Sequence, residues 1–419
     1  MPSPSDSRSD SRIVLLDSGL SRRVGHHAHF GQGLAQLCAK DGIPLVTLAL
    51  KTIESELAAD LANPRAVFTR DFYQPAAGGD LFDQAWNDYR VGERLYTADL
   101  DQSGIEPRAS DLLWIPTARA REIAGFADWL LKHAVRPRVV LGFHRLMRPM
   151  EPGSVEGLVH RLAARRLIEA VGRDHILIYT NHYRVARHMA AVMNFAVHLA
   201  PMPLFYDPPA LGAKPPTVPN GKGPLVACVG APRPDKSGLP LPDIVREALR
   251  RRADLRFVIQ VNGAENNSAL MTLERMPQVQ LVKTWLDDGA FVALIQAADM
   301  LLMPYRRDRY AERTSGPFSF AAAYGRPAIV PSGTWMAERI ARKQAAGIAY
   351  KRDAAVIDAL TVAADRLPAL HAQAARLVQR WRTWDGEALL RVVRQWATGD
   401  GTGKLRRVDP KPPPSAGPA

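Results

Sequence analysis

Two basic side chains, three residues apart, follow a short apolar strand in the second half of the chain. The run 226–229 ends at Gly230, and the loop behind it presents Arg233 and Lys236. A guanidinium and an ammonium held at a strand end suit a diphosphate, because its charge is spread over several oxygens. A glycine turn that leads into a helix adds backbone N–H groups and a positive dipole end directed at the same anion. Taken alone, the pair favours two ordinary exposed basic residues, but its place at the end of a buried strand favours a phosphate-binding loop.

A second set of polar residues lies further along the chain, in front of an apolar helix. Glu312 comes first, and Thr314, Ser315 and Gly316 follow it. We expect Gly316 to be the N-cap and Pro317 the first helical residue, a favoured start that removes one N–H. A phosphate would then rest on the amides of Ser315 and Gly316 and on the hydroxyls of Thr314 and Ser315. The alternative is an ordinary capped helix with Glu312 as a surface acid.

The order and spacing of these residues resemble the nucleotide-binding half of GT-B glycosyltransferases, specifically the retaining family-four type (glycosyltransferase group 1). That pattern runs strand, Gly-x-x-Arg-x-x-Lys-Gly, a strand end with proline, Glu-x7-Glu, and Gly-x-Pro before another strand. Gly230, Arg233 and Lys236 match its first element, and Glu312 matches its first acid by the distance to Gly325. The resemblance implies that the two basic residues bind the diphosphate of a nucleotide-sugar donor and that Glu312 lies near the sugar.

The resemblance covers roughly residues 224–340, and the sequence departs from the pattern at two places within it. Ser237 stands before Gly238, where the family usually has glycine. The second acid of the pair falls on Phe320, which accepts no hydrogen bond from a ribose diol. Ribose recognition then comes from elsewhere or is weak. Either Phe320 offers the ribose an apolar contact in the usual place, or it packs in the core beneath the helix.

Apolar strands alternate with helical stretches along most of the 419 residues, a length that suits two domains. This alternation predicts an α/β fold, and the resemblance implies the GT-B form of it, with two Rossmann-like, doubly wound parallel-sheet domains facing a cleft. The expected parts are a disordered tail (1–12), an acceptor-side domain (13–203), a proline- and glycine-rich linker (204–223), a nucleotide-sugar domain (224–380), a helix crossing back (381–398) and a second disordered tail (399–419).

Histidines gather at strand ends in the first half of the chain. Gly25, His26 and His27 occupy the first strand–helix loop, where the resemblance places a glycine near the donor phosphates, and Gly25 permits close backbone approach. The spacing of His26, His27 and His29 is poor for a closed metal site, so ordinary loop and helix-face histidines are the plainer interpretation. His144 ends a later strand, a usual place for functional groups. The resemblance puts it beside the sugar, and a hydrogen-bonded, half-buried histidine is the alternative.

Composition narrows the class of protein. Hydrophobic residues make up 47% of the chain and charged residues 23%, as in soluble globular proteins. Cys38 and Cys228 lie in apolar segments and are better read as small core residues of a reducing compartment than as a disulfide. No apolar run is long enough to span a bilayer, and the first residues lack a signal sequence. We therefore expect a cytoplasmic protein.

The formal net charge of +13 leaves two interpretations open. One is an ordinary basic surface, and the other is peripheral contact with the inner face of an anionic membrane. The segment 160–171 alternates basic and apolar residues at helical spacing, as a membrane-surface helix would, although a helix packing its apolar face on the sheet is the plainer explanation. No lysine-rich block or aromatic RNA motif is present, so we expect no nucleic-acid partner.

The combined expectation is a glycosyltransferase that moves a sugar from a nucleoside diphosphate sugar to the hydroxyl of a glycan or lipid-linked acceptor. The resemblance implies retention of the anomeric configuration, no metal or other cofactor, and a place in polysaccharide or glycolipid assembly. The alternatives are a non-catalytic nucleotide-sugar-binding GT-B protein and a GT-B nucleotide-sugar epimerase. The sequence contains no catalytic triad, P-loop or Gly-x-Gly-x-x-Gly fingerprint, which argues against hydrolases, kinases and dehydrogenases.

Overall fold

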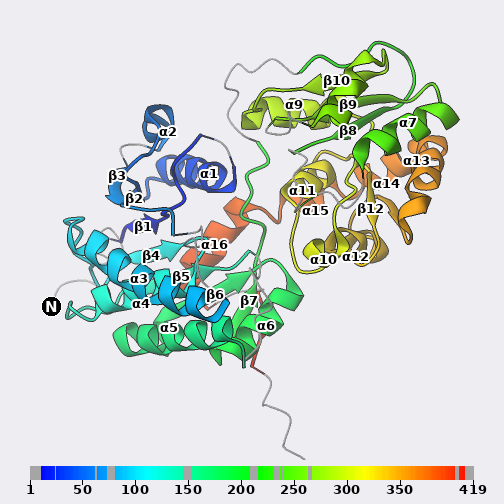
Figure 1. The fold of residues 1–419 in the computed structure, drawn as a ribbon. Coiled ribbons are helices and arrows are strands. Elements are labelled where there is room, and N and C mark those ends of the chain that lie inside the picture. Colours follow the sequence, from blue (N-terminus) through cyan, green and yellow to red (C-terminus); the bar gives the residue numbers. More distant parts are fainter. Residues whose placement is uncertain are drawn as a thin grey trace, which may run out of the picture. The chain divides into compact units, whose positions relative to one another are not determined.

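The computed structural model describes residues 11–23, 25–61, 64–72, 81–144, 153–207, 216–230, 236, 240–262, 267–401 and 405–410. The chain divides into two compact units (Figure 1). Unit 1 comprises Met1–Pro203 and Gly386–Ala419, and unit 2 comprises Leu204–Asp385. Each unit is an α/β fold around its own sheet, which confirms the predicted class.

Unit 1 is built on a sheet of eight strands among the described residues, in the order β14-β7-β6-β5-β4-β1-β2-β3. All its pairs are parallel except the last one at the β14 edge. Its strands are short apolar runs, as is typical of a parallel sheet covered on both faces. Their bounds are β1 Ile13–Leu16, β2 Leu45–Leu50, β3 Arg65–Phe68, β4 Leu112–Ile115, β5 Arg138–Gly142, β6 Ile176–Thr180, β7 Val197–Leu199 and β14 Arg406–Val408.

Helices cover both faces of this sheet (Figure 1). Strand residues alternate between the two layers: Val14 and Leu16 enter the core formed with α3 to α6, whereas Trp114 meets Phe30 of α1 with ring centroids 5.3 Å apart. Helix α16 packs beside α1. The helix bounds are α1 His26–Lys40, α2 Ser55–Asp60, α3 Leu81–Asp101, α4 Ala120–Leu130, α5 Val155–Val171, α6 Tyr183–Met193 and α16 Gly386–Ala397.

The C-terminal segment corrects one expectation. We expected residues 399–419 to be disordered, but Arg406–Val408 form strand β14, which pairs antiparallel with β7. Leu405 and Val408 are buried on either side of the two exposed arginines. Two apolar side chains and one ladder of backbone hydrogen bonds are enough to hold such a segment once a sheet edge is available, and composition alone does not reveal that edge.

Unit 2 contains a second parallel sheet, of six strands among the described residues, in the order β10-β9-β8-β11-β12-β13. The chain order reverses between β8 and β11, as in a doubly wound sheet. The strand bounds are β8 Leu225–Cys228, β9 Arg256–Gln260, β10 Val279–Val282, β11 Met300–Leu302, β12 Ala328–Pro331 and β13 Gly347–Tyr350.

The helices of unit 2 also form two layers. Helices α7, α8, α13 and α14 share one core with the sheet, and α9, α11 and α15 pack together apart from that core. The bounds are α7 Leu241–Arg251, α8 Ser268–Met271, α9 Asp288–Ala297, α10 Arg307–Tyr310, α11 Gly316–Ala323, α12 Trp335–Ala341, α13 Val356–Asp365, α14 Leu367–Ala375 and α15 Val378–Arg382.

The long helical stretch near the C-terminus is divided into several helices. Pro368 lies in the first turn of α14, where its missing N–H is tolerated and its ring starts a new helix. Helix α15 ends at Arg382 within unit 2, and α16 begins at Gly386 as part of unit 1. The segment expected as one helix over 381–398 is therefore two helices, with the change of unit between them.

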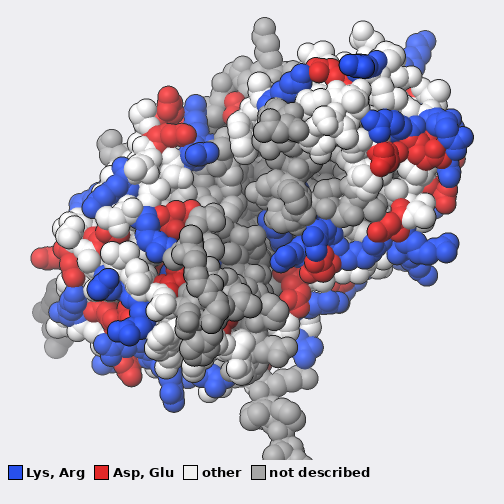
Figure 2. Space-filling view, viewed as in Figure 1, with Lys and Arg blue, Asp and Glu red and all other residues white. Residues whose placement is uncertain are grey.

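Charge is spread over the surface in mixed groups. Figure 2 shows lysine and arginine side chains gathered over α10 and α12, with acidic side chains among them. Arg307 pairs with Asp353, and Arg306 pairs with Asp308 at 2.8 Å. Part of the basic excess is thus neutralised locally. Across the described residues, no helix combines the length and apolarity that a membrane span requires.

Candidate functional site

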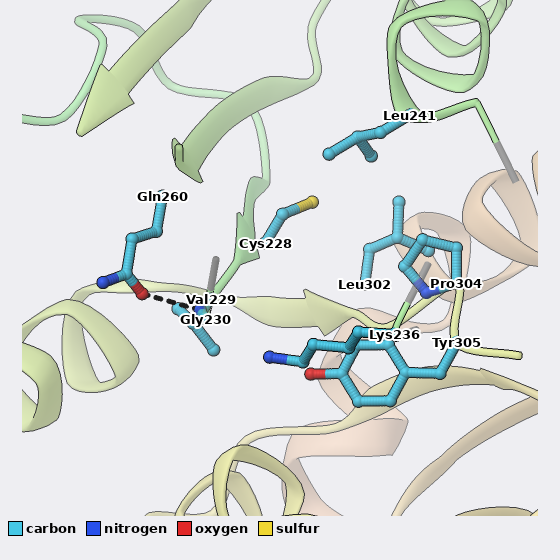
Figure 3. A pocket seen from close by; sticks show the side chains of 9 residues that line it. All are labelled: Cys228, Val229, Gly230, Lys236, Leu241, Gln260, Leu302, Pro304 and Tyr305. Carbon is cyan, nitrogen blue, oxygen red and sulfur yellow. Dashed lines mark hydrogen bonds between the residues drawn. The ribbon is translucent and has the colours of Figure 1, made fainter. Parts of the chain in front are cut away.

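A small cavity lies at the carboxyl edge of the unit 2 sheet, between β8 and β11 (Figure 3). The chain order reverses here, and open α/β sheets bind ligands at such a point. Its volume of about 30 Å³ holds roughly two water molecules and is too small for a nucleotide. It marks where side chains converge: Cys228, Val229, Gly230, Lys236, Leu241, Gln260, Leu302, Pro304 and Tyr305.

Gly230 and Lys236 lie against each other in this cavity (Figure 3). Gly230 has a φ of 82°, and a β-carbon on it would overlap the Nζ of Lys236. The Gly230 N–H donates to Oε1 of Gln260 at 2.6 Å, which fixes the turn after β8. The Lys236 carbonyl accepts the N–H of Arg306 at 3.0 Å, and Nζ lies 5.0 Å from the centroid of the Tyr305 ring. The ammonium is therefore held directly over the strand end.

The start of helix α11 lies beside the same glycine. A β-carbon on Gly230 would lie 4.0 Å from Cγ of Pro317. Ser315 is the N-cap, since its Oγ accepts the N–H of Phe318 at 3.3 Å. The expectation that Gly316 caps the helix is wrong by one residue. A serine side chain has an oxygen that accepts a free N–H of the first turn, whereas glycine has no side chain to do so. A β-carbon on Gly316 would meet nothing within 4 Å, so the space in front of this turn is open.

The hydroxyl of Tyr305, which lines the cavity, is buried and has no hydrogen-bond partner among the described residues. Burial raises the pKa of Tyr305 well above its ordinary value, and the nearby Tyr310 adds to the rise. Tyr305 is therefore a neutral phenol across the physiological range. Sequence reasoning assigned no role to Tyr305 or to Gln260. Gln260 could have been noticed in the sequence, because it is a glutamine at the end of the mostly apolar strand β9.

The structure brings Gly230 and Lys236 of the predicted site together and places the first turn of α11, which Ser315 caps, beside Gly230. Glu312 and Thr314 are half-buried in the turn between α10 and α11. Arg233 lies outside the described residues. The contacts of these residues with a donor remain predictions.

Phe320 lies in the interior of unit 2. It is 5% exposed, and its ring meets Tyr206 and Phe291 edge-on, with centroids 5.2 and 5.5 Å away. The hydroxyl of Tyr324 donates to the carbonyl of Tyr206, which ties the segment 204–207 to the same helix. Of the two sequence alternatives for Phe320, burial beneath the helix is correct and contact with the ribose is wrong.

Unit 1 gathers a second group of polar side chains at the carboxyl edge of its sheet. His27, in the first turn of α1, and Asp17, after β1, form an ion pair with Nδ1 to Oδ1 at 2.7 Å. Oδ1 also accepts the N–H of Gly19 at 3.0 Å. A β-carbon on Gly19 would overlap the imidazole, so only glycine permits this approach. Burial lowers the pKa of His27, but the charge and hydrogen bond of Asp17, together with the charges of Asp71 and Glu122, raise it, and the net pKa is above the ordinary value.

His144 follows β5 and faces the same group. Its ring lies 6.4 Å from those of His26 and Tyr179, centroid to centroid. Burial, and then the charge of His27, lower the pKa of His144 to about 4. His144 is therefore neutral at pH 7, and its ring can accept or donate one hydrogen bond to a hydroxyl. The unit thus holds a neutral and a charge-paired histidine side by side.

Glu122 is a buried acid beneath this group, which sequence reasoning missed. Its Oε1 accepts the hydroxyl of Ser18 at 3.0 Å. Burial raises the pKa of Glu122 to about 7, and the nearby Arg121 and Arg119 oppose the rise. The available signal was an acid in the first turn of a mostly apolar helix.

Gly25 precedes α1 as its N-cap, with a φ of 100° and no side-chain cap. A β-carbon on Gly25 would meet nothing within 4 Å, so the space beside this turn is open. The predicted role of Gly25 near the donor phosphates requires such space and stays a prediction. Within the described ranges, no three His, Cys, Asp or Glu side chains are arranged to hold a metal ion.

No family model matches this sequence, and no curated protein matches it. Solved structures do share its fold. Sucrose-phosphate synthase from Thermosynechococcus elongatus is 13% identical, with 93% of this chain and 99% of that chain covered and a TM-score of 0.58. Anabaena Alr3699/HepE, solved in complex with UDP, is 13% identical over 93% and 100% of the two chains, with a TM-score of 0.57. A putative UDP-N-acetylglucosamine 2-epimerase from Listeria monocytogenes is 12% identical over 93% and 96%, with a TM-score of 0.56.

These likenesses, with two doubly wound parallel-sheet units, show that the chain has the GT-B fold. Glycosyltransferases predominate among the named structures, and one is a putative epimerase. At this level of identity the likeness defines the architecture, and function has to be argued from the site.

Proposed function

We propose that this protein is a glycosyltransferase that moves a sugar from a nucleoside diphosphate donor to an acceptor hydroxyl. The observation that carries the proposal is the placement of the Lys236 ammonium over Gly230 at the switch point of the unit 2 sheet. A glycine turn, a fixed cation and the open start of α11 converge there, which is the chemistry that a diphosphate needs. HepE, which shares the fold, is named as a complex with UDP and with UDP-glucose.

In this mechanism negative charge develops on the leaving diphosphate. Lys236, together with Arg233, neutralises that charge as the glycosidic bond to the donor breaks. The N–H of Gly316 adds a donor at the start of α11. Glu312 acts near the sugar, and neutral His144 contacts sugar or acceptor hydroxyls. By the family-four resemblance, transfer retains the anomeric configuration and needs no metal.

Calorimetry with UDP and GDP tests the donor site. Lys236→Ala should weaken binding by about 1.5–3 kcal/mol, the range for hydrogen bonds to charged groups, and should affect the bare nucleosides far less. The control is Lys222→Ala, which removes an exposed lysine of the same unit and should change neither ligand. Equal losses for diphosphate and nucleoside would show that Lys236 does not contact phosphate.

The structural likeness to a putative epimerase supports a second candidate, a nucleotide-sugar epimerase. An epimerase interconverts donors without an acceptor, whereas a transferase releases nucleoside diphosphate only when an acceptor is present. A panel of nucleotide sugars, incubated with and without glycan and lipid-linked acceptors, separates the two. Turnover of any donor also excludes the third reading, a non-catalytic nucleotide-sugar-binding protein. NMR of the product anomer with and without EDTA then tests retention and metal independence.

Peripheral membrane contact through α5 belongs to the same proposal. Leu158 and Arg165 of this helix are exposed, but Arg161 donates to the Val192 carbonyl and Arg166 pairs with Asp128. Two of the three arginines therefore serve the fold. Co-sedimentation with anionic vesicles, compared for the wild type and Arg165→Glu, tests whether the remaining surface binds lipid.

A further inference from the structure

Two neighbouring side chains of α12 carry buried N–H groups that lack an acceptor. In the part of the chain that the structure describes, neither Nε1 of Trp335 nor Nε of Arg339 has a hydrogen-bond partner. Trp335 is 3% exposed, and the guanidinium of Arg339, one helical turn later, lies over its ring at 5.5 Å from the centroid. Buried donors are rarely left unsatisfied, because each has lost its hydration without a replacement. A ligand that accepts hydrogen bonds would recover that free energy.

The guanidinium of Arg339 is held in place but is poorly neutralised. It donates to Oε1 of Gln344 at 2.8 Å and to Oε1 of Glu338 at 3.4 Å. Glu338 is shared, since it also pairs with Arg342 at 2.7 Å. Burial lowers the pKa of Arg339, and the charge of Glu338 opposes this effect. The charges of Arg342 and Arg380 lower the pKa further, so the three arginines repel one another.

Helix α15 brings the third of these arginines to the end of α12. Arg380 is exposed and precedes Trp381, whose indole N–H donates to the carbonyl of Gln344 at 2.8 Å. The ring of Trp381 also lies 6.2 Å from that of Trp335, centroid to centroid. These contacts fix the two helices against each other. The arginine cluster (Arg339, Arg342 and Arg380) is therefore built from two elements that hold a constant geometry.

The charge of the arginine cluster indicates the kind of ligand. Three guanidinium groups and the single carboxylate of Glu338 leave two positive charges in excess. A phosphate monoester carries about −1.5 to −2 charges at pH 7 and presents three strong acceptor oxygens, and guanidinium groups bind such oxygens in pairs. We propose that the arginine cluster and the indole N–H of Trp335 bind a phosphate monoester.

This site is separate from the one proposed for the donor. The cavity at Gly230 is lined by other residues, whereas the arginine cluster lies on α12 and α15, and Figure 2 shows basic side chains gathered over α12. The inference goes beyond the proposed function and does not depend on it. A phosphate monoester has two sources, a soluble ester and a lipid headgroup. Glycerol 3-phosphate and vesicles of phosphatidic acid in phosphatidylcholine present the same group in the two forms.

Calorimetry with glycerol 3-phosphate tests the site, at an ionic strength of about 0.15 M to screen distant charges. The double variant Arg342→Gln/Arg380→Gln changes two exposed residues and should weaken binding about ten-fold or more, because it removes hydrogen bonds between charged groups. The control Lys222→Gln/Arg366→Gln removes the same charge at other exposed positions of unit 2 and should bind as the wild type does. Equal losses in the two double variants, or no binding by the wild type, would overturn the proposal.

Two single variants define the site further. Lys236→Ala should leave the affinity for glycerol 3-phosphate unchanged, and loss of binding in this variant but not in Arg342→Gln/Arg380→Gln would place the phosphate at Gly230 and refute a separate site. Trp335→Phe keeps an aromatic ring and removes the N–H, so the affinity should fall about three-fold or more. An unchanged affinity in Trp335→Phe would remove the indole from the site.

Co-sedimentation with the vesicles distinguishes the two sources. Binding to phosphatidic acid vesicles that is lost in Arg342→Gln/Arg380→Gln, with none to phosphatidylcholine alone, would assign the site to a lipid headgroup. Binding of glycerol 3-phosphate without co-sedimentation would assign it to a soluble ester. Because neither probe contains a nucleotide, these outcomes are independent of whether the protein binds UDP or transfers a sugar.

Discussion

The ammonium of Lys236 occupies the space that a side chain on Gly230 would need. Gly230 also holds a φ of 82°, which other residues rarely adopt. Gly230→Ala should therefore lose about 1–3 kcal/mol of stability through backbone strain and, in addition, displace the ammonium and weaken diphosphate binding. Thermal unfolding and calorimetry with UDP measure the two effects separately.

Gly333→Ala is the matched control for that change. Gly333 lies in the same unit with a φ of 80°, but a β-carbon on it would meet nothing within 4 Å. Gly333→Ala should lose stability through backbone strain but keep its affinity for the diphosphate. Equal affinities of the two variants for the diphosphate would mean that the position of Lys236 does not matter for the ligand.

Glu312→Gln should separate activity from folding. Glu312 is half-buried in a turn and is not part of the core, so the melting temperature should change little. Transfer should fall by about ten-fold or more if the carboxylate stabilises charge developing at the sugar. Glu274→Gln, which alters an exposed acid paired with Lys283, is the control for both measurements. Normal turnover of Glu312→Gln would place that acid outside the reaction.

Phe320→Glu should destabilise unit 2 by several kcal/mol, because it buries a carboxylate between the rings of Tyr206 and Phe291. Phe320→Leu keeps the site apolar and should cost much less. Urea unfolding of the two variants gives the comparison. Stability close to the wild type in Phe320→Glu, with a gain in nucleotide affinity, would contradict the observed packing and return position 320 to the donor site.

The Asp17–His27 pair should make stability depend on pH. The folded pKa of His27 lies above its unfolded value of about 6.5. The pair's contribution to the free energy of unfolding is therefore complete below about pH 6.5. It is lost as the pH rises through the folded pKa of His27. Melting temperatures of the wild type and Asp17→Asn should differ most between about pH 5 and 6 and converge at higher pH. A difference that does not vary with pH would show that the pair is not linked to protonation.

Local patterns of the sequence determined much of the fold. Short buried runs followed by helical spacings mark parallel α/β units, because both faces of such strands must be apolar. The candidate phosphate-binding residues Gly230 and Lys236 could be found for the same reason, since a strand end, a glycine and basic residues are all close together in the chain. The GT-B form of this fold was expected from the resemblance of these local features to a known family.

Only the tertiary structure decided the features that depend on distant contacts. Whether Phe320 met a ribose or the core depended on Tyr206, far away in the chain. Strand β14 needed the edge of β7, and the lack of hydrogen-bond partners for the Asn262 amide among the described residues depends on how those residues pack. Periodicity specifies which faces of an element are apolar, whereas the partner that each side chain meets is fixed by how the elements pack.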